Sequence, residues 1–176
     1  MLAFFAALLA AVPSASPTPP ASEAPPLEAA SPWWERITVT VDGKGTQQGC
    51  RYETSAAGSS ACDAAMAASI RSGGKGTSGL FRKVTFERRF SPGGRPDAAP
   101  MAPGDTLLGR QVMYLTIDAK GAIETCKVIA VSGDAAPDYD CDEVKKERFS
   151  IADGGAAASR QAFMTVMAYG HTEAIA

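Results

Sequence analysis

The stretch ITVTVDGKGTQQGCR, residues 37–51, aligns without a gap with MYLTIDAKGAIETCK, residues 113–127. The two copies share a threonine, an aspartate, a lysine, a glycine and a cysteine at equivalent positions. A second Cys-Asp pair follows each copy, beginning at Cys62 in the first and at Cys141 in the second. An internal repeat of this kind indicates a duplicated structural unit, so the chain is best interpreted as two related halves.

Both halves predict the same order of elements. Ile37, Val39 and Val41 alternate with polar residues, which is the period-two pattern of a half-buried strand, and an Asp-Gly-Lys-Gly turn follows. A second strand, a helix, a Gly-rich loop and a closing strand come next. The expected helices are residues 61–71 and 138–149, and the expected closing strands are residues 80–90 and 161–169. The sequence therefore predicts an α+β fold of two tandem β-β-α-β units with antiparallel sheets and helices on one face.

Composition sets the expected boundaries. The two units occupy residues 33–92 and 109–176, and a Pro- and Gly-rich linker joins them over residues 93–108. Residues 17–32 are a Pro-rich linker, and residues 1–16 are predicted to be a signal peptide. The apolar run inside residues 1–16 is shorter than the roughly 20 residues that span a bilayer, so no stable membrane insertion is expected. A buried N-terminal helix is the alternative interpretation of that run.

Four cysteines, two in each unit, predict a disulfide framework. The duplication selects pairing within units, Cys50 with Cys62 and Cys126 with Cys141. Closing a loop of about 15 residues contributes roughly 3 kcal/mol on the chain-entropy model, which matters for units this small. Paired cysteines also favour an oxidising compartment and hence export. The cysteine spacings do not fit a zinc finger, and the chain has a single histidine, so no metal and no cofactor are expected.

Charge and motifs argue against several function classes. A net charge of −2 disfavours a nucleic-acid-binding protein. No nucleophile-elbow or zinc-protease motif occurs, and His171 lies close to the chain end, so the chain is predicted not to be an enzyme. The carboxylates of residues 138–143 are interpreted as favourable partners of a helix N-terminus rather than as a cation site. An enzyme of unknown type, dependent on His171, remains an alternative.

The second unit resembles the C-terminal domain of TonB-type energy transducers. The resemblance is carried by the strand and Asp-Ala-Lys-Gly turn of residues 112–121, the strand of residues 123–128, Ser132-Gly133 and Arg148-Phe149, in the order that the family shows. It covers residues 108–170 and, through the repeat, extends faintly to residues 36–90. It implies a fold and a binding mode, whereas force transduction would need a membrane anchor longer than the apolar run at the start of this chain.

The resemblance implies a periplasmic module that engages an envelope protein, such as an outer-membrane receptor or a transporter component, by strand addition. The closing strands, Lys83–Phe90 and Ala162–Tyr169, are the expected sheet edges, and the basic residues of the first would guard such an edge. The expected partner-binding residues are Lys83, Thr85, Arg88, Phe163, Thr165 and Met167.

Three alternatives stay open. If the two units pair through their closing strands, the chain is a closed pseudo-dimer and the binding site lies elsewhere. The chain could instead be a structural or inhibitory envelope protein that uses its sheets as a scaffold for loops. A homodimer is also left open.

Overall fold

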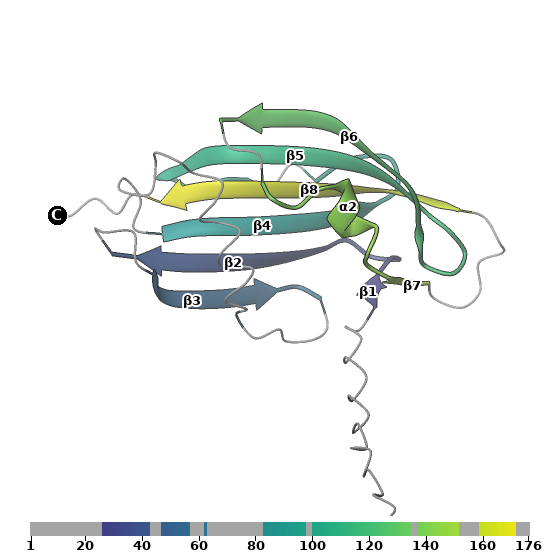
Figure 1. Cartoon of the computed structure of the whole chain (residues 1–176), viewed down its shortest axis with the longest axis horizontal. Coiled ribbons are helices and arrows are strands. Elements are labelled where there is room, and N and C mark those ends of the chain that lie inside the picture. Colours follow the sequence, from purple (N-terminus) through teal and green to yellow (C-terminus); the bar gives the residue numbers. More distant parts are fainter. Residues whose placement is uncertain are drawn as a thin grey trace, which may run out of the picture.

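The computed structural model describes residues 26–42, 47–56, 62, 83–97, 100–134, 137–151 and 159–171. Its centre is one six-stranded antiparallel sheet with the order β3-β2-β4-β8-β5-β6, as Figure 1 shows. The strands are β2 (Trp33–Val41), β3 (Gln47–Thr54), β4 (Lys83–Pro92), β5 (Asp105–Ile117), β6 (Ile123–Gly133) and β8 (Arg160–His171).

The two repeats meet in the middle of this sheet. β2, β3 and β4 come from the first repeat, and β5, β6 and β8 come from the second. β4 pairs with β8 along its whole length, with Phe86 opposite Ala168 and Phe90 opposite Met164. The closing strands of the two repeats therefore join them into one continuous sheet, which is the pseudo-dimer arrangement.

The expected α+β fold with two β-β-α-β units is wrong. Of the described residues, 63% lie in strands and 4% are helical. The helix expected over residues 138–149 shrinks to α2 (Cys141–Val144), because bonds from Lys146 N to Glu143 O and from Glu147 N to Val144 O tighten its last turn. The helix expected over residues 61–71 lies outside the described residues apart from Cys62.

After the short helix α2, the chain forms part of a second, two-stranded sheet. β7 (Phe149–Ser150) pairs in parallel with β1 (Leu27–Glu28), which lies within the predicted Pro-rich linker. The backbone amide of Leu27 donates to the carbonyl of Arg148 at 2.7 Å, and the Trp33 indole donates to the carbonyl of Glu28 at 2.7 Å. The N-terminal part of the described chain is thus fastened to the second repeat.

The hydrophobic core lies on one side of the large sheet, which we call the inner face. Figure 1 shows α2 lying over the sheet, and Val144 of this helix packs with Phe149 of β7 against the inner face. Phe90 stacks on Trp33 with ring centroids 5.6 Å apart, and it also contacts Phe149 at 5.2 Å. Buried side chains of β5 complete this cluster, namely Met113, Leu115 and Ile117.

The other side of the sheet, the outer face, carries the alternate residues of each strand. Glu87, Thr165 and Met167 are buried there among their neighbours. Among the described residues, no helix is long and apolar enough to cross a membrane.

Candidate functional site: the two edges of the sheet

The expectation that the closing strands are edges is wrong. β4 lies between β2 and β8, and β8 lies between β4 and β5, so their backbone groups are paired on both sides. No further strand can add to either of them. The six expected partner-binding residues consequently lie in the middle of the sheet, as Lys83, Thr85 and Arg88 of β4 and Phe163, Thr165 and Met167 of β8.

Arg88 is a buried structural residue. Its guanidinium donates to Glu35 and Glu147, and to the Tyr139 hydroxyl at 2.6 Å. Its Cζ lies 5.5 Å from the centre of the Trp33 ring. Burial by itself would lower the pKa of Arg88, but the surrounding Tyr139, Glu147 and Glu35 raise it above its ordinary value. Arg88 is therefore fully engaged inside the protein.

The outer face holds a second ionic cluster around Glu87. Burial would raise the pKa of this carboxyl, but hydrogen bonds from Arg36, Arg89 and Tyr169 outweigh that effect and lower it. The bond from Arg36 Nε is 2.8 Å long and that from the Tyr169 hydroxyl is 2.9 Å. The ionised form of Glu87 is thus favoured, and it pairs with the partly exposed Arg36 and with Arg89, which also pairs with Asp97.

A polar hollow of about 220 Å³ lies on the outer face beside this cluster. Its lining includes Arg36, Lys83, Asp105, Tyr169 and His171. His171 Nδ1 lies 3.0 Å from an oxygen of Asp105, and Arg36 is held by Glu87, so these groups have partners within the protein.

No cysteine or serine lines this hollow among the described residues. In the same part of the chain, no group of three or more His, Cys, Asp or Glu residues is placed to hold a metal ion.

The true edges of the sheet are β3 and β6, which Figure 1 shows at its two sides. β3 is a polar edge. Its exposed Gln48 donates to Asp42 at 3.0 Å, and Arg51 pairs with Glu53 at 2.8 Å. Charged side chains on an edge strand discourage pairing with another chain, so β3 is protected.

β6 is an edge strand eleven residues long, with the exposed Glu124 and Lys127 in its first half and an apolar run over residues 128–131. The described residues include four exposed large hydrophobic side chains, and three of them belong to β6. These are Val128, Ile129 and Val131, with exposed fractions of 39%, 49% and 60%. A bulge opposite Val112 and Met113 leaves Ile129 as the extra residue of β6. The unpaired backbone of an edge strand is a template for pairing with another strand, and the apolar run of residues 128–131 favours such pairing.

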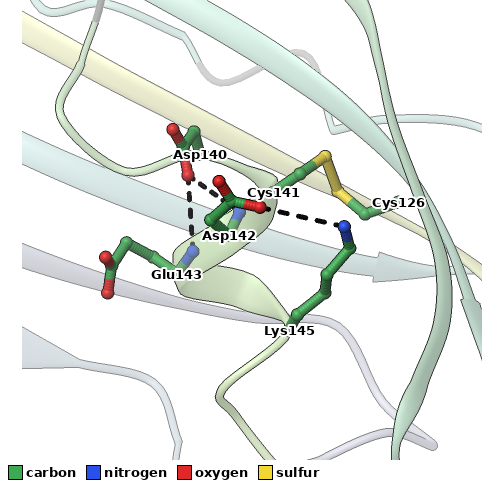
Figure 2. The surroundings of a disulfide bond; sticks show 6 residues. All are labelled: Cys126, Asp140, Cys141, Asp142, Glu143 and Lys145. Carbon is green, nitrogen blue, oxygen red and sulfur yellow. Dashed lines mark hydrogen bonds and ion pairs between the residues drawn. A yellow bond between two sulfur atoms is a disulfide. The ribbon is translucent and has the colours of Figure 1, made fainter.

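A disulfide holds β6 against α2. Figure 2 shows Cys126 of β6 bonded to Cys141 at the start of the helix. The same figure shows Asp140 capping that helix by accepting from the backbone amides of Asp142 at 2.8 Å and Glu143 at 3.3 Å. The second disulfide joins Cys50 to Cys62, so both predicted pairs are confirmed.

The strand β6 was predicted from the sequence, but its position at the edge of the sheet was not. The available signal was the unbroken apolar run of residues 128–131, which differs from the polar equivalent strand of the first repeat. Comparison of the chain with protein-family models, with curated proteins and with solved structures found no match.

Proposed function

We propose that this chain is an exported protein-binding module that adds an extended segment of an envelope protein to the free side of β6. One observation carries the proposal. β6 is a long strand paired on one side only, and it bears three of the four exposed large hydrophobic side chains of the described residues. In strand addition, main-chain hydrogen bonds supply affinity, and contacts of alternate side chains supply specificity.

The inner side of the edge would supply most of the side-chain contacts. In register with β5, Val128 lies opposite Met113 and Val131 lies opposite Gln111, so both belong to the inner face. An added strand would lie about 4.8 Å from β6 and would cover these side chains. Full burial of one valine or isoleucine side chain contributes roughly 1.5–3 kcal/mol. The half-exposed side chains of β6 would each gain part of that.

Export and a periplasmic location rest on separate features. The two disulfides support folding in an oxidising compartment, and the apolar run at residues 2–12 supports secretion. The resemblance of the second repeat to TonB C-terminal domains supports an envelope partner.

A charged substitution on β6 tests the proposal that this edge binds an extended segment. The purified chain is titrated against an array of extended octapeptides that alternate aliphatic and polar residues. We expect Ile129→Lys to weaken the binding at least tenfold, about 1.4 kcal/mol, because a lysine on an edge strand opposes pairing. Thermal stability should not change, because Ile129 is half exposed.

The matched control is Gln48→Lys, which places the same charge on the polar edge β3. Gln48 is exposed, and we expect this variant to bind as the parent chain does. Equal binding by Ile129→Lys and the parent chain would refute the proposed function, and so would loss of binding in the Gln48→Lys variant alone.

A further inference from the structure

Two consecutive residues of β5 have a buried side-chain nitrogen without a hydrogen-bond partner. They are Arg110, through Nε, and Gln111, through Nε2. In the register of the sheet, Arg110 lies opposite Ser132 and Gln111 opposite Val131, so both lie beside the C-terminal end of β6. A buried donor without an acceptor costs about 1–3 kcal/mol, and folded proteins contain few of them. Beside the C-terminal end of β6, each face of the sheet therefore has a buried side-chain donor that lacks a hydrogen-bond acceptor.

Arg110 differs from the neighbouring arginines of the outer face. Arg36 pairs with Glu87, and Arg89 pairs with Glu87 and with Asp97 at 2.7 Å. Arg110 forms no ion pair within the described part of the chain. A guanidinium is a cation with five N–H donors. The outer face therefore has a cation for which the described residues supply no anion.

The surroundings of Arg110 show from which side an anion can approach. On the β8 side its neighbour is Met167, which is 3% exposed, and the diagonal neighbour Thr165 is 1% exposed. On the other side its neighbour is Ser132, an exposed residue of β6. Of the two neighbours of Arg110 across the sheet, only Ser132 is exposed, so an anion can approach Arg110 from the free side of β6.

We propose that the segment added to β6 carries an aspartate or glutamate on its outer side that pairs with Arg110, and aliphatic residues on its inner side. This inference rests on the proposed function. Two strand spacings, about 10 Å, separate β5 from the added strand. An arginine and a carboxylate side chain extended toward each other across the small Ser132 can bridge this separation.

The carboxylate would set the register of the partner. Aliphatic contacts to Val128, Ile129 and Val131 alone would tolerate a shift by two residues, because the same face would still be apolar. Pairing with Arg110 favours one register, and it disfavours a segment that places a lysine at the same position.

A positional peptide scan tests this inference. Octapeptides of alternating valine and threonine carry glutamate, glutamine or lysine in place of one outward threonine at a time. Binding to the intact chain is measured by fluorescence anisotropy. At one position we expect glutamate to bind about tenfold more tightly than glutamine, with lysine the weakest. In Arg110→Gln this preference should disappear, while the affinity for the glutamine peptide stays the same.

Two further variants keep the experiment interpretable. Arg51→Gln on β3 should retain the full preference for glutamate. Arg110→Lys keeps the charge without the planar guanidinium and should retain part of the preference. The melting temperature of Arg110→Gln should not fall, because no hydrogen bond or ion pair to Arg110 is lost.

The outcomes separate the two proposals. If glutamate and glutamine peptides bind the parent chain equally, the inference about Arg110 is overturned, while strand addition at β6 stands. A preference that persists in Arg110→Gln overturns it as well. If no peptide of the scan binds the parent chain, the proposed function and this inference fail together.

Discussion

At the scale of single residues, buried charges join the two repeats. Arg88 belongs to the first repeat, and it contacts Glu35 of the same repeat but Glu147 and Tyr139 of the second. The contacts of Arg88 with Glu147 and Tyr139 form only when both repeats are in place. Breaking a buried ion pair by removing one member leaves an uncompensated charge, which costs far more than losing a surface pair.

We therefore expect Arg88→Met to lower the free energy of unfolding by about 3–5 kcal/mol, because Glu35 and Glu147 lose their shared cation. Arg51→Met removes the exposed pair with Glu53 and should cost less than about 1 kcal/mol. Urea unfolding of both variants makes the comparison. Similar losses in the two would show that Arg88 acts as an ordinary surface arginine.

Glu87 should make stability depend on acid pH. Its pKa in the folded protein lies below the ordinary value of 4.5, because hydrogen bonds from Arg36, Arg89 and Tyr169 outweigh the effect of burial. The stability that it contributes is present above pH 4.5 and is lost as the pH falls through the lower folded pKa. We expect Glu87→Gln to be less stable at neutral pH and to lose less stability on acidification.

Urea unfolding of the parent chain and of Glu87→Gln over about pH 2–7 tests this expectation. Parallel stability curves for the two proteins across the acid range would contradict it.

At the scale of elements, one turn holds β5, β6 and β7 together. Gly121 lies in the turn between β5 and β6 with a φ of +79°, and its carbonyl accepts from the amide of Phe149 at 2.8 Å. A Cβ at position 121 would lie 1.8 Å from the Phe149 carbonyl oxygen. Neither the backbone conformation nor the available space therefore permits another residue at this position.

Gly121→Ala should consequently lower the melting temperature by several degrees or prevent folding, because β7 would have to move away from the turn. Gly49→Ala on β3 is the control, since its added Cβ would meet no atom within 4 Å. Differential scanning calorimetry of both variants compares them. Equal melting temperatures for the two would exclude this role of Gly121.

The strands could be predicted from the sequence, but their order in the sheet could not be decided, since pairing of the closing strands was only one of the alternatives left open. Alternating apolar residues such as Ile37, Val39 and Val41 reveal one buried face of a strand, and strands are present wherever this pattern indicated them. Alternation does not identify the adjacent strand. The charges of β4 resembled the protection of an edge, yet Glu87 and Arg88 are buried because each finds its counter-charge inside the fold.

The candidate site was missed for a related reason. Exposure of Val128, Ile129 and Val131 depends on β6 being the last strand of the sheet, which local sequence does not report. Whether Arg110 has a hydrogen-bond acceptor nearby likewise depends on which strands lie beside β5, and the local sequence does not show this. In contrast, the duplication alone identified both disulfide pairs, because equivalent cysteines occupy equivalent places in the two repeats.

At the scale of the whole molecule, the central pairing of β4 with β8 predicts one cooperative unit. Trp33 and Trp34 lie in β2 of the first repeat, whereas Leu115 is fully buried in β5 of the second. Leu115→Ala should cost about 2–5 kcal/mol. We expect the tryptophan fluorescence transition to shift to lower urea by the same amount as the circular dichroism transition.

Val131→Ala, at an exposed edge position, should leave both transitions in place. A fluorescence transition that does not move in Leu115→Ala would show that the two repeats unfold independently.

Duplication within one chain also frees this architecture from a constraint that a true dimer obeys. Two identical subunits joined through their closing strands would present two identical outer edges, and each edge would offer the same site. Here the covalent joining of two diverged copies breaks that symmetry, so that β3 is polar while β6 carries an exposed apolar run. The two edges of the sheet are therefore not equivalent. The protein would bind one partner segment per chain, whereas a symmetric dimer would bind two.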